Sequence, residues 1–144
     1  MRAVLPIMVK QGGGQIINVI SGIAFMPMAA QSRYAATKAA LNALSITLRS
    51  EYWDDNIKIS SATPGTTATG IFAAGGVKAP ETAQAPRQSA SRILNGVVNN
   101  DRIIYGDDGD VSGGSYGSHP EAQKGNDEYL LRVARERREG KASY

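Results

Sequence analysis

The sequence predicts an α/β fold, with a parallel sheet of about three strands flanked by helices. Short apolar or β-branched runs alternate with longer helical patterns, which is typical of layered α/β proteins with parallel strands. The chain has 144 residues, of which 42% are hydrophobic and 20% are charged. That length suffices for one modest core, and that composition is close to the globular average. We therefore expect the sheet and its helices to form one unit over residues 1–106.

The first strand is expected over Gln15–Ile20. This run is short, apolar and β-branched, as the buried strands of parallel sheets are. Residues Arg2–Val9 before it have the pattern of the end of a helix. The glycines at 12–14 end that helix, because glycine readily adopts the left-handed conformation that follows a helix. A loop over Gly22–Gln31 comes after the strand.

A long helix is expected over Ser32–Trp53, because this segment is rich in alanine, the strongest helix former. Six of its side chains recur every three or four positions and so share one helix face: Tyr34, Lys38, Leu41, Ser45, Leu48 and Tyr52. The alternating run Ile57–Ala62 follows and predicts a second strand. Pro64 and Gly65 end that strand, since both residues favour turns.

The segment Thr66–Arg87 is rich in Ala, Gly, Thr and Pro and predicts a mobile loop with one helical turn. An amphipathic helix is expected over Gln88–Val98, with Ile93, Leu94 and Val97 on one side. A third strand is expected over Arg102–Gly106.

The C-terminal part is expected to contain a loop and one helix. Residues 107–126 are polar and turn-rich, which predicts a poorly ordered loop. Residues 127–144 form the last helix and tail, with the helix over about 127–139. Asn126 is a suitable N-cap for that helix, since acids occupy the first turn and arginines the last.

Composition excludes several functions. The sequence has no cysteine, which removes disulfides, thiolate zinc sites and thiol nucleophiles. The net charge is +3, but the excess arginines near the C-terminus are interleaved with acids, which favours a solvated helix over a nucleic-acid surface. No apolar run has the length of a membrane span, and the first residues lack the pattern of a signal peptide. We therefore expect a cytoplasmic protein with no nucleic-acid or membrane partner.

No metal site is expected. His119 is the single histidine of the sequence and has no second histidine near it. The cluster of Asp107, Asp108 and Asp110 lacks the spacing of a calcium-binding loop, so we interpret it as a solvated turn.

Tyr34 and Lys38 are the first candidates for chemistry. They are four residues apart, so on a helix they lie on one face, one turn apart. A phenol titrates near pH 10, and a neighbouring ammonium lowers that pKa toward the range useful for acid–base catalysis. Ser21 lies thirteen residues before Tyr34, at the end of a predicted strand, where open α/β sheets build their sites. Each residue alone also fits a purely structural role; their combination favours a catalytic one.

Three motifs together resemble the second half of the short-chain dehydrogenase/reductase family. The strand motif G-x-I-[IV]-N-x-x-S occurs as GQIINVIS, the helix motif Y-x-x-x-K as YAATK, and the turn motif P-G-x-x-x-T as PGTTAT. The resemblance is strong over Leu5–Phe72 and weaker as far as Gly106. It implies that the chain carries part of a Rossmann-type fold.

The resemblance implies catalytic roles for three residues. Tyr34 would exchange a proton with the substrate oxygen. Lys38 would lower the pKa of Tyr34 and hydrogen-bond the nicotinamide ribose. Ser21 would hydrogen-bond and orient the reacting oxygen.

The resemblance also implies a cofactor pocket, with NAD or NADP as the cofactor. Pro64, Gly65 and Thr67 would line the nicotinamide site, Thr67 through its backbone. Thr69 would contact the carboxamide, and Tyr34 and Lys38 would complete the site. The segment 68–87 would cover the substrate, an alcohol or a carbonyl compound.

The resemblance further implies that the family's glycine-rich phosphate turn and its catalytic asparagine precede residue 1. We therefore expect a fragment of a longer NAD(P)-dependent oxidoreductase that transfers hydride between a nicotinamide and its substrate. The strand Gln15–Ile20 would then have an exposed apolar edge, which predicts a chain that is marginally folded or self-associating, with a homo-oligomer expected. The alternative is a truncated, catalytically silent protein that acts only through association.

Overall fold

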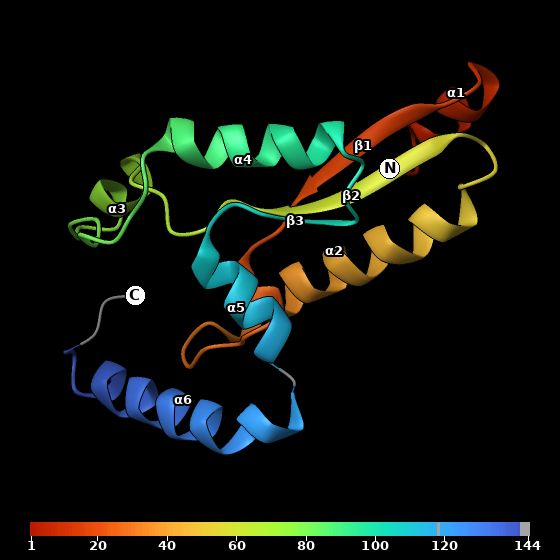
Figure 1. Cartoon of the computed structure of the whole chain (residues 1–144). Helices are drawn as coiled ribbons and strands as arrows, with labels where there is room; N and C mark the ends of the chain where they lie inside the picture. The colour runs from red at the N-terminus through yellow and green to blue at the C-terminus, as the bar shows by residue number, and fades with distance from the viewer. Residues whose placement is uncertain (118, 142–144) are drawn as a thin grey trace.

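The computed structural model describes residues 1–117 and 119–141. Its centre is a parallel sheet of three strands, β1 (Gly14–Val19), β2 (Ile57–Thr63) and β3 (Ile103–Tyr105), in the order β1-β2-β3. All three strands were predicted, and most of their ends differ from the predicted ends by one residue. The sheet confirms the expected α/β class (Figure 1).

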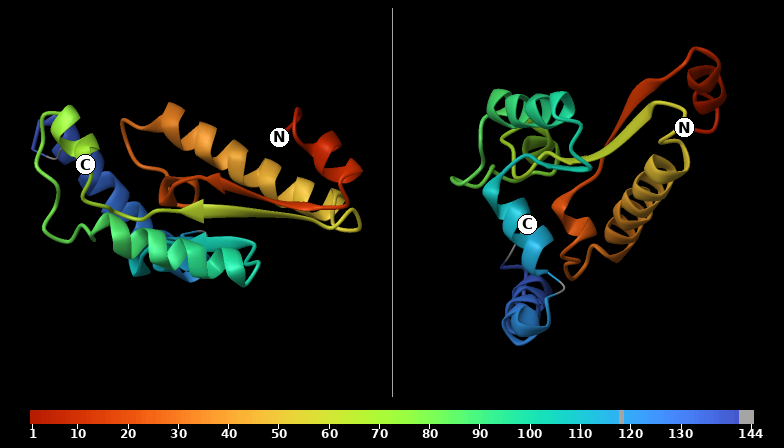
Figure 2. Two further views of the ribbon diagram at one scale, coloured as in Figure 1. Left: turned by 90° about the horizontal axis from the view of Figure 1, so that it is seen from above. Right: turned by 45° about the vertical axis from the view of Figure 1, so that its right-hand side comes forward.

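Helices cover both faces of the sheet. Figure 2 shows α1 (Leu5–Lys10) and α2 (Ser32–Glu51) on one face and α4 (Pro86–Val98) on the other. Two of these helices carry a proline in the first turn, where its missing N–H costs no intrahelical hydrogen bond. Crossover helices on both faces are the usual way to connect and bury a parallel sheet.

The centre of the core lies on β2, which has a neighbour on each side. Ile57 and Ile59 are fully buried and pack with Leu5 of α1. Arg49 of α2 donates hydrogen bonds to the Ile59 carbonyl at 2.8 Å and to Asn100 after α4. One arginine therefore joins α2 on one face of the sheet to the residues after α4 on the other face and also bonds the central strand.

The predicted face of α2 packs against the sheet over most of its length. Ser45 is 1% exposed; its Oγ accepts a hydrogen bond from Asn18 of β1 at 2.9 Å. Tyr34 is the exception at 47% exposed, because the first turn of α2 extends past the end of β1.

The amphipathic face predicted for α4 is partly wrong. Leu94 is 63% exposed, whereas Ile93 and Val97 are half-buried. The most buried position on this part of the helix is Gly96, where a Cβ would overlap the Ile104 side chain of β3. The close approach of α4 to β3 therefore depends on a residue without a side chain, which hydrophobic periodicity does not detect.

The loop predicted over 107–126 is wrong. The structure has helix α5 (Asp108–Tyr116) and a 3₁₀ turn η2 (Pro120–Ala122) there, and α6 (Gln123–Arg138) begins four residues earlier than expected. Asn126 therefore lies inside α6 instead of capping it. Contacts of Asp107 and Gly114 explain why α5 forms.

The side chain of Asp107 caps α5 by accepting the backbone N–H of Asp110 at 2.7 Å. A capping carboxylate stabilises the first turn of a helix through both its hydrogen bond and the helix dipole. Gly114 lies so close to the Tyr105 side chain that a Cβ would overlap it. Glycines that indicated a loop in the sequence thus permit the helix to pack beside β3.

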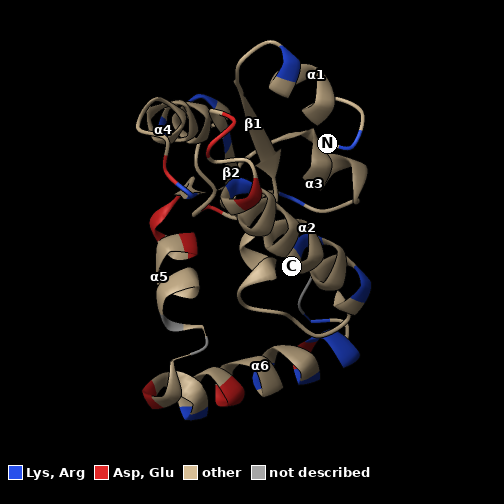
Figure 3. Cartoon of the chain, turned by 90° about the vertical axis from the view of Figure 1, so that its right-hand side faces the viewer, with Lys and Arg blue, Asp and Glu red and all other residues tan. Residues whose placement is uncertain are grey.

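Two features of the surface are the outer edge of β1 and the charged residues of α6. β1 pairs with β2 along one edge only within the described residues, so its other edge is unpaired, and Val19 is 52% exposed. Figure 3 shows acidic and basic residues together along α6, with arginines in its last turn. Among the helices of the described chain, none is both long enough and apolar enough to cross a membrane.

Candidate active site

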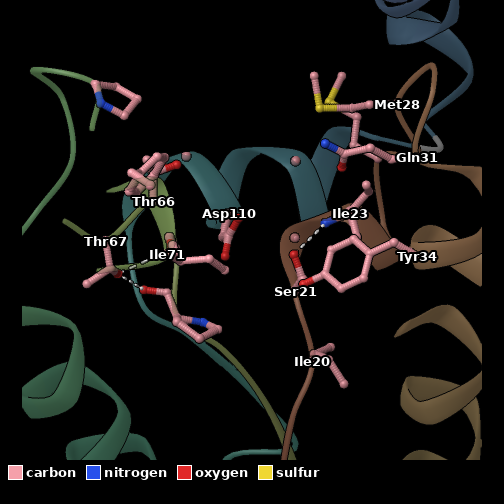
Figure 4. A pocket seen from close by; sticks show the side chains of 18 of the residues that line it. Ile20, Ser21, Ile23, Met28, Gln31, Tyr34, Thr66, Thr67, Ile71 and Asp110 are labelled. Atoms are coloured by element: carbon pink, nitrogen blue, oxygen red, sulfur yellow. Dashed lines mark hydrogen bonds between the residues drawn. The ribbon is translucent and has the colours of Figure 1, made fainter. Parts of the chain in front are cut away.

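A pocket of about 800 Å³ lies where β1 and β2 end (Figure 4). The carboxyl ends of parallel strands are where open α/β sheets bind ligands, and this volume is in the range of small-molecule sites. Six of the seven residues proposed from the sequence line it: Ser21, Tyr34, Pro64, Gly65, Thr67 and Thr69.

Ser21 leaves the end of β1 in an extended conformation and begins the short 3₁₀ helix η1 (Gly22–Ala24). Its Oγ accepts the backbone N–H of Ile23 at 3.4 Å, and Figure 4 shows this bond at the pocket wall. A serine hydroxyl both accepts and donates. Because Ile23 uses only its acceptor capacity, the Ser21 O–H can still donate into the pocket.

Tyr34 lies in the first turn of α2, and Figure 4 shows its ring next to Ser21. Lys38 follows one turn later. Its Nζ lies 5.7 Å from the centroid of the Tyr34 ring and donates a hydrogen bond to the carbonyl of Val19 at 3.0 Å. Lys38 is the one predicted residue outside the pocket wall, but the last residue of β1 holds it beside the tyrosine.

The turn after β2 is stabilised by Asp107, a residue from a later part of the chain. Gly65 has a φ of +72°, in the region that favours glycine, and a Cβ there would overlap the carboxylate of Asp107. The same carboxylate accepts the backbone N–H of Thr66 at 2.7 Å. Thr67 Oγ1 donates within the turn, with the Pro64 and Gly65 carbonyls 3.1 and 3.2 Å away. Its side chain is thus used to shape the turn.

The segment after this turn folds back onto it. Gln84 Nε2 donates to the carbonyls of Pro64 at 2.9 Å and Gly106 at 3.0 Å, and Ser89 Oγ donates to Pro64 at 2.6 Å. The one helical turn that was expected in this segment is α3 (Gly70–Ala74), which lies between Thr69 and Gln84 in the sequence. These bonds position Thr69 and α3 over the pocket.

Asp110 was missed by the sequence analysis, which interpreted it as part of a solvated turn. It lies in the first turn of α5, and its carboxylate packs so closely on Gly22 that a Cβ there would overlap it. Figure 4 shows this carboxylate in the pocket. The acid three residues after Asp107 is a helix-start pattern that could have located it.

Burial raises the pKa of Asp110 above its ordinary value, because a charged carboxylate is less stable away from water. The negative charge of Asp107 raises it further. The Thr63 hydroxyl and the Gly65 backbone oppose this shift by favouring the charged form. A carboxyl group with a raised pKa in a pocket is typical of functional sites.

The sequence matches a known family. A family model described as short chain dehydrogenase matches residues 1–77. The 2,5-dichloro-2,5-cyclohexadiene-1,4-diol dehydrogenase LinX of Sphingobium indicum is 33% identical over 100 residues, which are 67% of this chain and 36% of LinX. The chain thus spans about a third of the length of this curated relative.

Two solved structures have the same fold. A short-chain dehydrogenase of Burkholderia cenocepacia in complex with NADP aligns with a TM-score of 0.76 at 23% identity, over 90% of this chain and 54% of that one. A short-chain dehydrogenase of Sphingobium yanoikuyae in complex with NADPH aligns with a TM-score of 0.69, also at 23% identity, over 99% of this chain and 51% of that one. Since the family model covers more than half of its residues, the chain belongs to the short-chain dehydrogenase family.

Proposed function

We propose that this chain supplies the catalytic residues of an NAD(P)-dependent oxidoreductase acting on an alcohol or carbonyl substrate. The observation that carries the proposal is the convergence of Ser21, Tyr34 and Lys38 on the end of β1, beside one pocket. Family membership supports it, as do the NADP and NADPH complexes of proteins with the same fold.

The residues present fit a nicotinamide cofactor. The Pro64–Thr67 turn is hydrogen-bonded to Asp107 and Gln84 and forms one wall of the pocket. Lys38 uses one of its three N–H donors on Val19, which leaves two for ribose hydroxyls. When bound, the nicotinamide supplies or accepts the hydride. The choice between NAD and NADP stays open in this proposal.

The chain's own residues transfer the proton and orient the substrate. Tyr34 donates its phenolic proton to the carbonyl oxygen as that oxygen becomes an alcohol, and takes it back in the oxidation. The Ser21 hydroxyl donates a hydrogen bond to the same oxygen. The positive charge of Lys38 stabilises the negative charge left on the tyrosine oxygen.

The first test is a titration of the protein with NADH and NADPH, followed by nicotinamide fluorescence and then by turnover with a ketone panel. Tyr34→Phe should lower kcat by about a hundredfold or more, the usual contribution of general acid–base catalysis, and leave cofactor binding largely intact. Tyr52→Phe, at the C-cap of the same helix but packed against the core, is the matched control. Turnover retained in Tyr34→Phe, or no binding of either nucleotide by the folded chain, would contradict the proposal.

A second candidate is a catalytically silent protein that acts through association. The observation that favours it is the edge of β1 that pairs with no described residue, in a strand that contains Ile16, Ile17 and Val19, since such edges readily pair with another chain. We propose for either candidate that copies of the chain form a homo-oligomer. Sedimentation across a range of concentrations tests this, and a monomer at every concentration would contradict it. An ordered oligomer that binds no nucleotide would favour the silent protein.

A further inference from the structure

Arg137, in the last turn of α6, lines the same pocket as Ser21 and Tyr34. Its Nη1 donates a hydrogen bond to the carbonyl of Ala29, in the loop that precedes α2. A residue 108 positions away along the chain thus brings a guanidinium to the pocket.

The other nitrogens of this guanidinium lack partners. Nε and Nη2 are both buried and make no hydrogen bond within the described residues. Among all the described residues, two ion pairs form, Arg92 with Asp108 and Lys141 with Glu139. No described carboxylate therefore pairs with Arg137. Burying a charged group without a partner is costly. Such a group in a pocket therefore indicates a ligand of opposite charge.

The surroundings strengthen this argument. The pocket is lined largely by apolar side chains, among them Met28, Ile71 and Pro80. In such a medium an ion pair is electrostatically stronger than in water. The one acidic residue among the lining residues is Asp110, and it packs against Gly22, whereas Arg137 is attached to Ala29. The two charges are therefore held by different parts of the η1 loop.

We propose that Arg137 binds an anionic group, a carboxylate in the simplest case, on the carbonyl or alcohol substrate. The planar guanidinium presents Nε and Nη2 side by side, which is the geometry that pairs with both oxygens of a carboxylate. This inference rests on the proposed function, because it assigns a substrate class to the same pocket. It adds a specificity-determining residue from a helix that the motifs do not include.

The test compares two probes of nearly equal shape, 4-acetylbenzoate and 4-acetylbenzamide. Their affinities for the full chain are measured by calorimetry without cofactor, and their kcat/KM values with NADH and NADPH. The variants are Arg137→Met, Arg137→Lys and the control Arg138→Gln. Arg138 is the next residue on α6 and is exposed. Its substitution by Gln therefore removes one positive charge outside the pocket.

We expect the protein to bind the benzoate about tenfold or more tightly than the amide, the scale of one charge-assisted pair. Arg137→Met should abolish this preference, Arg137→Lys should retain part of it, and Arg138→Gln should retain all of it. Equal binding of the two probes by the unaltered chain would overturn the proposal, and that comparison requires no variant to fold. A preference that survives in Arg137→Met would overturn it as well.

Two further outcomes separate the alternatives. If Arg137→Met weakens NADPH binding and leaves the probe preference unchanged, the anion is a cofactor phosphate, and the substrate proposal is wrong. If the benzoate preference is found but no ketone is reduced, the anion site stands and the proposed redox function fails. Binding and turnover thus report separately on the two proposals.

Discussion

The two sides of the pocket are built in different ways. The side that carries Ser21, Tyr34 and Lys38 is bonded directly to the sheet: Lys38 to the last residue of β1, and α2 to β2 through Arg49. The side that carries Asp110 and Arg137 comes from α5 and α6. Among the described residues of α6, Val133 alone is buried. A reacting group must be held within fractions of an ångström, whereas a substrate wall can vary without loss of the chemistry.

The largest expected effect contrasts the two sides by removing one buried side chain from each. Ile59→Ala, in the central strand, should lower the free energy of unfolding by about 2–5 kcal/mol, because it opens a cavity in the core. Val133→Ala, on α6, should cost about 1 kcal/mol or less, because most of that helix faces solvent. Urea titrations followed by circular dichroism measure both. Similar losses at the two positions would contradict this contrast.

Gly65, in the turn of the proposed cofactor wall, and Gly76, after α3, sharpen the comparison. Both have φ near +70°, so alanine is strained at either position. At Gly65 the new Cβ would also overlap Asp107, whereas at Gly76 nothing lies within 4 Å. We expect Gly65→Ala to cost about 2 kcal/mol or more and Gly76→Ala about 1 kcal/mol, the cost of the backbone strain alone. Thermal melts of the two variants check this, and equal melting temperatures would refute a role for the contact.

Asp107 joins the turn after β2 to the side built from α5, because its carboxylate accepts the backbone N–H of Thr66 and caps α5. Asp107→Ala should cost about 1–2 kcal/mol, the range of a lost helix cap. On the proposed function, it should also weaken nicotinamide binding, since the turn after β2 loses its support. Asp108→Ala is the control: it removes an exposed pair with Arg92, and such pairs contribute little. If both variants bind nucleotide equally, the turn after β2 does not depend on Asp107 for cofactor binding.

Asp110 predicts a small pH dependence on the side of the pocket built from α5 and α6. Its folded-state pKa is raised above 3.8 by burial, so the folded protein holds this proton more tightly than the unfolded chain. Its stabilising contribution is complete below pH 3.8 and is lost as the pH rises through the raised pKa. Asp110→Asn cannot ionise, so its unfolding free energy relative to the unaltered protein should increase over this interval. A difference that stays constant from pH 3 to 7 would show that Asp110 titrates normally.

The sequence by itself determined the sheet, α2 and the three motifs. Each of these elements has a hydrophobic period or a helix-forming composition that acts over a few neighbouring residues, as Ile57–Ala62 and the alanines of α2 illustrate. The strand ends follow from the same local patterns, and with them the positions of Ser21, Pro64 and Gly65. Their convergence on one pocket was predictable, because parallel strands end at a common edge.

Only the tertiary structure decided the other side of the pocket. The glycines of α5 favour a loop in isolation, and the helix forms because Asp107 caps it and Gly114 fits beside Tyr105. Arg137 has the local pattern of a solvated helix end, and it lines the pocket because α6 returns to Ala29. These outcomes depend on contacts between residues far apart in the chain. Local periodicity therefore carries no information about them.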